Sequence, residues 1–150
     1  EGLVEALGGR VTGSEKAFGS AGTVFKKTAD DSCGTVVIAN RQTAGASEFT
    51  EMDRTDFPKT QDNDPKEVRN AAVRLGTKAT LNMTADATVS ALVFDSNDAR
   101  ILLNGHKLYI LGTAKRSVKD FVRSRATPGV DADGNPGEII WRSGFVLFVR

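Results

Sequence analysis

The sequence contains a single cysteine, Cys33, and a single histidine, His106, among 150 residues. An intramolecular disulfide is therefore impossible, and a zinc site of the Cys/His type cannot be assembled. No apolar run approaches the roughly 20 residues that a membrane-spanning helix needs. The sequence also lacks the charged start followed by an apolar segment that is typical of a signal peptide. These absences argue against a disulfide-stapled secreted scaffold and predict no membrane partner.

Motifs of nucleotide chemistry are also missing, since the chain contains no Walker-type phosphate loop and no dinucleotide-binding fingerprint. Twenty basic residues against 19 acidic ones give a net charge of +1. Such a balance produces no general field for nucleic acid or an anionic membrane. We therefore expect no enzyme activity, no catalytic residues, no cofactor and no nucleic-acid partner.

Length and composition indicate one domain with a thin core. A chain of 150 residues fits a single domain, but the hydrophobic share of 39% is low, and 15 glycines indicate many turns. We divide the chain into a Gly-rich N-terminal arm at 1–22, with a frayed terminus as the alternative, and one β-rich domain at 23–150. A polar excursion at 42–64 interrupts the domain, and long loops of this kind are usually functional or disordered.

Strand patterns dominate the remainder. The strongest is the β-branched run at 34–40. The pair Asn104-Gly105 separates two apolar runs and predicts a hairpin, because both turn residues must adopt positive φ. A second hairpin is predicted around Ser143-Gly144, and no internal repeat is recognised. The expected strands lie at 24–28, 34–40, 78–84, 89–94, 100–103, 107–111, 138–141 and 145–149.

Two short helices complete the expected elements. Asp64-Pro65-Lys66-Glu67 has the features of a helix start, with apolar residues at helical spacing up to Gly76. The second helix covers 115–125. We therefore predict a mainly β fold, an antiparallel β-sandwich or barrel with one or two short α-helices and an extended N-terminal arm.

A calcium-loop pattern starts at Asp131. Asp131, Asp133 and Asn135 match the first positions of an EF-hand loop, where alternate oxygens converge on one cation. The sixth position, which needs Gly, is Pro136, and the twelfth, which needs Glu, is Arg142. We therefore interpret these three residues as an ordinary polar hairpin loop, with calcium binding as a minor alternative and no metal expected.

Other polar residues offer weak catalytic patterns. His106 follows the Asn104-Gly105 turn and has no nucleophile or carboxylate near it in sequence, which favours a surface role. Cys33 lacks an activating neighbour. The acidic residues of the excursion could supply a carboxylate pair for a hydrolase, but Arg54 and Lys59 among them indicate a solvated mixed surface. The acidic residues are Asp53, Asp56, Asp62 and Asp64.

A basic cluster on the second helix is the clearest charge asymmetry. On a helix its cations would lie opposite Val118, Phe121 and Val122. Pairing with the acidic loop, within or between subunits, is one reading, and a solvated helix face is the other. We take the cluster and the apolar residues of the arm and loop as interface candidates: Leu3, Val4, Leu7, Phe18, Phe49, Met52, Phe57, Lys115, Arg116, Lys119 and Arg123.

The segment from Val24 to Arg41 resembles the opening of β-sandwich domains in tailed-bacteriophage virion proteins. Val-Phe-Lys-Lys-Thr-Ala, a polar turn, and Thr-Val-Val-Ile-Ala-Asn-Arg carry the resemblance over about 20 residues. It implies a head-decoration, neck or tail accessory subunit, assembled in the host cytoplasm into the virion, with copies of itself and other virion proteins as partners in an oligomer or lattice. The alternative is a carbohydrate- or receptor-binding module of the adhesin kind, in which Trp141 and Tyr109 are the aromatic candidates.

Overall fold

The computed structural model describes residues 22–30, 32–39, 54–58 and 70–143. They contain one helix, α1 (Arg116–Ser124), and short strands throughout. The strands are β1 (Gly22–Lys26), β2 (Thr35–Ala39), β3 (Arg54–Phe57), β4 (Ala72–Leu75), β5 (Thr80–Met83), β6 (Ala87–Val89), β7 (Ala91–Phe94), β8 (Arg100–Leu102), β9 (Lys107–Leu111), β10 (Ala126–Thr127) and β11 (Glu138–Arg142).

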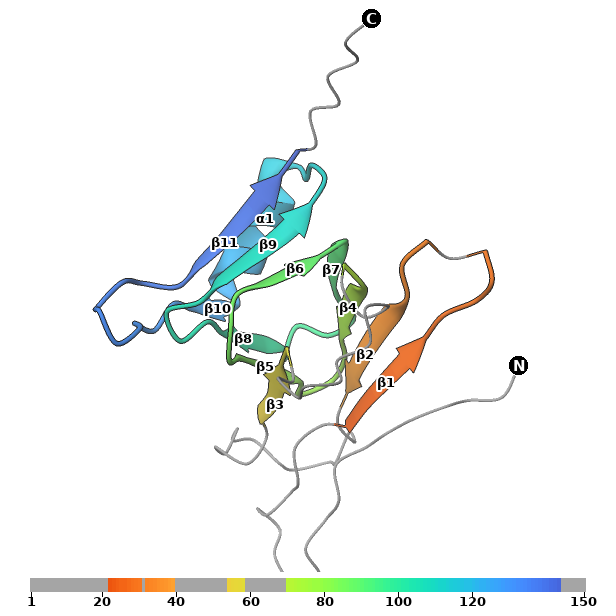
Figure 1. The fold of residues 1–150 in the computed structure, drawn as a ribbon, viewed down its shortest axis with the longest axis horizontal. Helices are drawn as coiled ribbons and strands as arrows, with labels where there is room; N and C mark the ends of the chain where they lie inside the picture. The colour runs from red at the N-terminus through yellow and green to blue at the C-terminus, as the bar shows by residue number, and fades with distance from the viewer. Residues whose placement is uncertain (1–21, 31, 40–53, 59–69, 144–150) are drawn as a thin grey trace, which may run out of the picture.

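The described strands form three sheets with the orders β1-β2-β4-β7, β10-β8-β5-β3 and β11-β9-β6. Every pair is parallel except the antiparallel pair of β1 and β2. From β2 onward, consecutive described strands lie in different sheets: β4, β5 and β6 each join another sheet before β7 returns beside β4. Figure 1 shows these strands on the sides of a triangle. The chain therefore winds as a parallel β-solenoid.

One coil of this solenoid takes about 20 residues. Ala72 pairs with Ala91, Thr80 with Arg100, and Ala87 with Leu108. Corresponding corners also recur, since the N–H of Ala79 donates to Gly76 at 3.3 Å and the N–H of Ala99 donates to Ser96 at 3.4 Å. Both alanines are fully buried. The structure thus contains a repeat that is not visible in the sequence. Each coil needs only a side chain of similar volume at the equivalent position, and several residue types meet this requirement.

Stacked rows of aliphatic side chains fill the coils. Register places Val36 beside Val73 and Leu81 beside Ile101, and all four are buried. Alternate residues of a strand point to opposite faces, so the period-two pattern of these segments puts one aliphatic row inside the coil. Each fully buried Leu or Ile contributes about 1.5–3 kcal/mol relative to an exposed one. These rows position the polar groups on the outer faces.

The ends of the first sheet are covered differently. At the N-terminal end β1 pairs with β2 in antiparallel fashion. At the C-terminal end α1 packs near β7, where Phe121 meets Phe94 edge to face with ring centroids 5.5 Å apart. Val122 of α1 is buried in the same core. The helix therefore lies against the end of the aliphatic rows. Its apolar spacing predicts this contact for Val118, Phe121 and Val122, and Phe121 and Val122 make it.

The prediction of a mainly β fold is confirmed. The described strands form mixed sheets and no closed barrel, a sandwich is not confirmed, and the expected antiparallel pairing is wrong for every described pair except β1 with β2. Alternation indicates a half-buried strand without indicating the direction of its partner. Asn104 and Gly105 do adopt the predicted positive φ values of 50° and 84°. Their turn, however, joins β8 of the second sheet to β9 of the third, so it forms a corner of the coil and the two strands are not hairpin partners.

The predicted helix at 64–75 is wrong over its last residues. Ala72–Leu75 is strand β4, and Ala71, Val73 and Leu75 are buried in alternation. The apolar residues of this stretch fit the period of a helix and that of a strand. Pairing with β2 and β7 in the tertiary structure decides for the strand. Residues 64–69 lie outside the described residues. The second helix, predicted at 115–125, is confirmed as α1.

The excursion at 42–64 is not a continuous surface loop, because Arg54–Phe57 within it forms β3 of the solenoid wall. Phe57 is only 8% exposed and pairs in register with Met83. It is therefore a core residue, and its assignment as an interface anchor is wrong. The arm at 1–21, the rest of the excursion and the strand expected at 145–149 lie outside the described residues.

Candidate interaction surface

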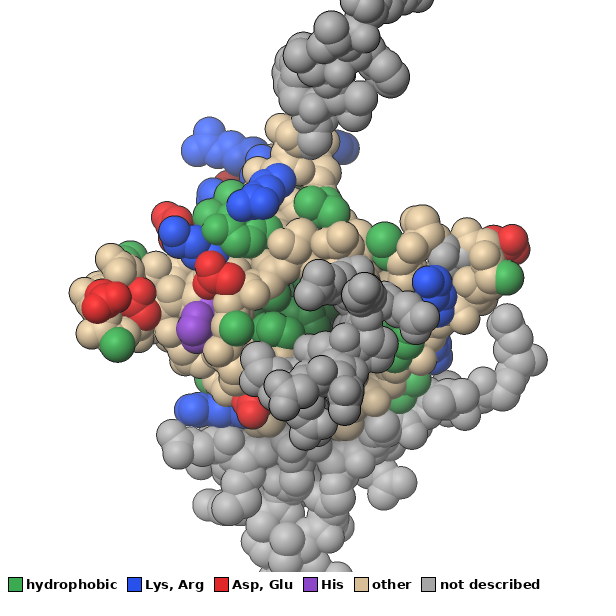
Figure 2. All heavy atoms as spheres, in the orientation of Figure 1, with side chains coloured by type: hydrophobic (Ala, Val, Ile, Leu, Met, Phe, Trp, Pro, Cys, Tyr) green, Lys and Arg blue, Asp and Glu red, His purple; other side chains and the backbone are tan. Residues whose placement is uncertain are grey.

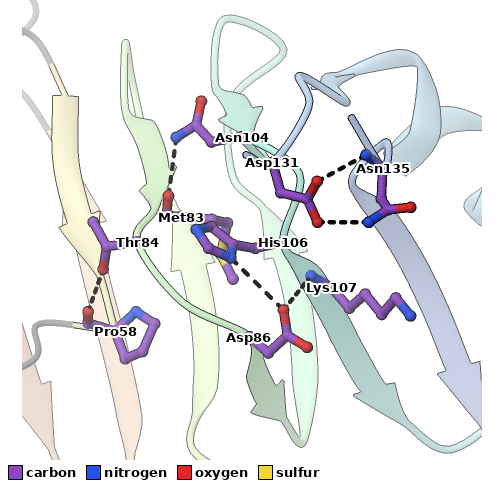
Figure 3. A network of polar contacts seen from close by, with 9 residues as sticks. All are labelled: Pro58, Met83, Thr84, Asp86, Asn104, His106, Lys107, Asp131 and Asn135. Atoms are coloured by element: carbon purple, nitrogen blue, oxygen red, sulfur yellow. Dashed lines mark hydrogen bonds and ion pairs between the residues drawn. The ribbon is translucent and has the colours of Figure 1, made fainter. Parts of the chain in front are cut away.

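A ladder of polar side chains connects three successive coils on the outside of the second sheet. The Nδ2 group of Asn82 donates to Oδ1 of Asp56 at 2.7 Å. The Nδ2 group of Asn104 donates to Oδ1 of Asn82 at 2.9 Å and to the carbonyl of Met83 at 2.9 Å, and Figure 3 shows the latter bond. Asp56, proposed as a possible acid/base group, is thus the first rung of a structural ladder.

The Asp131 carboxylate is occupied by its own loop (Figure 3). It accepts hydrogen bonds from the backbone N–H of Asp133 at 2.9 Å and of Asn135 at 2.8 Å, and from Nδ2 of Asn135 at 3.0 Å. These donors, led by the Asn135 side chain, hold the pKa of Asp131 below its usual value. The segment that matches the start of a calcium loop is therefore a polar turn whose groups bond to one another, and Asp133 contributes its backbone N–H to it.

His106 lies at the corner between β8 and β9, as the preceding turn predicts. Its Nδ1 atom is 3.8 Å from Oδ1 of Asp86, and the same oxygen accepts the backbone N–H of Lys107 at 2.8 Å (Figure 3). Asp86 is 20 residues earlier, one coil away, so only the coil period could have revealed this neighbour. Within the described part of the chain, no three His, Cys, Asp or Glu side chains are grouped as metal ligands would be.

Cationic and aromatic side chains gather at the C-terminal end of the solenoid. Nζ of Lys119 lies 5.4 Å and Cζ of Arg123 5.2 Å from the centroid of Trp141. On the outer face of the third sheet, Cζ of Arg142 lies 3.7 Å from the centroid of Tyr109. We call these five residues the cation–aromatic end. Figure 2 shows Lys and Arg side chains around apolar ones where β9, β11 and α1 lie, at the upper left.

The cations of this end lack acidic partners among the residues that the structure describes. Arg116 forms an i,i+4 ion pair with Asp120 at 3.7 Å, but no described carboxylate pairs with Lys119, Arg123 or Arg142. Asp56 belongs to β3, at the opposite end of its sheet from β10. Pairing between α1 and the described acid of the loop within one subunit is therefore absent.

The backbone of β11 presents a free edge among the described strands. The N–H of Glu138 donates to His106 at 3.1 Å, and the N–H of Gly112 donates to the carbonyl of Arg142 at 2.8 Å. In a regular strand, Glu138, Ile140 and Arg142 therefore direct their N–H and C=O groups toward β9, and Ile139 and Trp141 direct theirs away from it. Because β11 is the outermost described strand of its sheet, these groups have no strand partner among the residues that the structure describes.

A shallow depression of about 290 Å³ lies beside this edge. Its walls include Ala126 of β10 and Ile139 of β11, and Arg123 and Glu138 are its charged groups. Leu103, at 2% exposure, belongs to its apolar floor. The depression thus lies between the outermost described strands of two sheets, β10 and β11.

Several interface candidates have a described position. Lys115 and Arg116 are exposed at the start of α1, and Lys119 and Arg123 lie on Trp141. Sequence reasoning missed Tyr109, Trp141 and Arg142 as parts of the same surface. The remaining candidates lie outside the described residues: Leu3, Val4, Leu7, Phe18, Phe49 and Met52.

Comparison with known proteins leaves the surface without a counterpart, since no protein-family model, no curated protein and no solved structure matches this chain. Within the described part of the chain, no helix has the length and apolar character needed to cross a bilayer.

Proposed function

We infer that this protein is a non-enzymatic structural and assembly protein that acts through contacts with other protein subunits. The observation that carries the proposal is the C-terminal end of the solenoid. There, within the described part of the chain, a strand edge without a partner strand, half-buried aromatic rings and cations without an ion-pair partner occur together. Trp, Tyr and Arg are the residue types that dominate binding energy in protein interfaces. Polar groups elsewhere, such as those of the ladder and the Asp131 loop, bond to each other.

A role in the virion of a tailed bacteriophage, as a head-decoration, neck or tail accessory subunit, is the specific form of this proposal. Its support is the resemblance of residues 24–41, whose described part includes most of β1 and all of β2, an antiparallel pair. The β-sandwich that the resemblance implies differs from the observed architecture, because β2 continues into a parallel sheet through β4. The proposed localisation and partners therefore depend on those 20 residues, and the assembly role depends on the C-terminal end.

Quantitative mass spectrometry of purified phage particles tests the virion role. We expect this chain in a fixed ratio to the major capsid or tail protein, with its gene beside capsid, portal or tail genes. Presence only at trace level in particles, with the protein remaining in the host lysate, would overturn the virion role.

A carbohydrate- or receptor-binding module is a second candidate, favoured by the position of Tyr109. Its ring lies on the outer face of the third sheet and is half-buried, and sugar faces bind to aromatic rings that solvent can reach. Arg142, stacked at 3.7 Å, would have to move or contact an acidic sugar. Glycan-array binding lost in Tyr109→Ala and kept in Tyr109→Phe would support this candidate, and an array without any hit would remove it.

A further inference from the structure

We propose that the C-terminal end of the solenoid binds an extended, acidic segment of a partner protein, which adds to β11 as a new strand. The proposal rests on the assembly role inferred above and specifies the surface and chemistry of one contact. It follows from three properties of the described residues: the backbone edge of β11, the incomplete cover of the core at this end, and the charge around Trp141.

The backbone edge supplies the hydrogen bonds. Ile139 and Trp141 direct their N–H and C=O groups away from β9, as the bonding of Glu138 and Arg142 to the β9 side requires. Many edge strands are protected by proline, bulges or inward-pointing charges. β11 contains no proline, and its charged residues Glu138 and Arg142 face outward with Ile140. This edge therefore remains suited to strand addition.

The aliphatic rows show where an added strand would gain apolar contact. In the third sheet one inward row runs from Val89 through Ile110 to Trp141. Val89 and Ile110 are buried, with 1% and 5% exposure, whereas Trp141 at the end of the row is only half-buried. A further strand would cover the ring and continue the row.

The charge of the partner follows from Lys119 and Arg123. They are one helical turn apart on α1, and like charges at this spacing repel each other. Both nevertheless lie within 5.5 Å of one ring, and neither forms an ion pair with a described carboxylate. Arg142 adds a third cation on the other face of β11. A carboxylate on the added strand would contact both groups at once, so acidic segments are favoured over basic or neutral ones.

Trp141, the single tryptophan of the chain, reports on this site directly. The probe is a synthetic ten-residue peptide of alternating Val and Glu, titrated into the full chain at low salt while tryptophan fluorescence is followed. We expect a saturable change, amide exchange protection at Ile139 and Trp141, and at least a tenfold weaker affinity at high salt, because charges are screened. A Val/Lys peptide should not bind, and a variant with Pro at alternate positions should not bind, because Pro lacks the N–H donor.

Charge-reversal variants identify the surface. Lys119→Glu with Arg123→Glu should weaken binding at least tenfold, whereas Lys26→Glu with Lys27→Glu changes net charge equally on the exposed end of β1 and should leave it unchanged. Circular dichroism confirms folding of both, and the salt titration of the unmodified chain remains informative if either variant unfolds. Equal effects of the two pairs, or equal binding of the Val/Lys peptide, would overturn the proposal.

Self-association is the competing outcome. Light scattering that shows a concentration-dependent dimer of the unmodified chain, abolished by Lys119→Glu with Arg123→Glu, would assign this end to a second copy and overturn the separate acidic partner. Failure of the peptide to bind leaves the amount of this chain in phage particles unaffected, so the two proposals fail in distinguishable ways.

Discussion

Asn104 donates a side-chain hydrogen bond of 2.9 Å to Asn82, although 22 residues separate them in the chain. The distance in sequence is close to one coil, and the same register brings Asn82 to Asp56. Side-chain amides can donate and accept at once, so one amide per coil can extend such a ladder along the solenoid axis. This contact therefore connects coils in addition to the backbone bonds between strands.

Removal of the middle rung should destabilise the fold modestly. Asn82→Ala breaks the bonds to Asp56 and Asn104, and both bonds are solvent-accessible, so we expect a loss of about 1 kcal/mol in unfolding free energy. Urea denaturation monitored by circular dichroism measures it. Asn82→Gln is the matched control because it retains the amide. Equal stability of the Ala variant and the unmodified chain would show that the ladder has no net stabilising effect.

Truncation of a core side chain next to Asn82 should reduce the unfolding free energy much more than Asn82→Ala does. Leu81 is fully buried between Thr55 and Ile101 in register, so Leu81→Ala should cost about 2–5 kcal/mol through lost transfer energy and the cavity left behind. Val93→Ala, on a side chain of the outer face with 39% exposure, should cost less than about 1 kcal/mol. Similar losses for the two variants would contradict the assignment of the inner and outer faces.

Substitutions at Gly105 and Gly134 distinguish two energetic costs of a side chain at positive φ, which are backbone strain and a clash with neighbouring atoms. Both have φ above 80°, but a Cβ at Gly105 would clash with the backbone nitrogen of Asp131, and one at Gly134 would have no atom within 4 Å. We expect Gly134→Ala to cost about 1 kcal/mol from backbone strain and Gly105→Ala about 3 kcal/mol because the Asp131 loop must also move. Thermal unfolding of the two variants provides the comparison, and a Gly134→Ala variant as unstable as Gly105→Ala would refute it.

Acid should weaken the Asp131 loop. Hydrogen bonds lower the pKa of Asp131 in the folded state, so its contribution is complete above the unfolded pKa of about 3.9 and is lost as the pH falls through the lower folded value. Urea midpoints measured between about pH 5 and pH 2 should therefore fall less steeply for Asp131→Asn than for the unmodified chain. Asp133→Asn, where only the backbone bonds to Asp131, is the control, and identical slopes for all three proteins would contradict the expectation.

The ion pair of Arg74 and Asp95 should contribute little. Two bonds of 3.1 and 2.7 Å connect these residues, and this contact raises the pKa of Arg74. Their side chains are 49% and 37% exposed, so a double-mutant cycle with Arg74→Ala and Asp95→Ala should give a coupling of about 0.5 kcal/mol that shrinks in high salt. A coupling above about 2 kcal/mol would show that solvent screens this pair less than its exposure suggests.

Much of the local structure was predictable from sequence. The run at 34–40, the alternation at 78–84 and the positive φ of Asn104 and Gly105 agree with β2, β5 and the corner after β8. Helix α1 was predictable from its apolar spacing. The cation–aromatic end was predictable only in part, since Lys119 and Arg123 were identified while Trp141 was placed in a different strand pair.

Pairing direction and partner identity came from the tertiary structure, with a physical reason in each case. A strand that alternates apolar and polar residues buries the same face in a parallel or an antiparallel pair, so Asn104-Gly105 predicted a turn but not a coil corner. At 72–75, Ala and Leu tolerate helix and strand alike, and pairing with β2 and β7 decided for strand. Sequence by itself determined many of the strands, such as β2 and β5, the turn at Asn104-Gly105 and which side chains are charged, but neither β3 nor β4. Only the tertiary structure decided that the strands coil, because register between coils depends on contacts some 20 residues apart, and that winding brought Trp141 beneath Lys119 and Arg123.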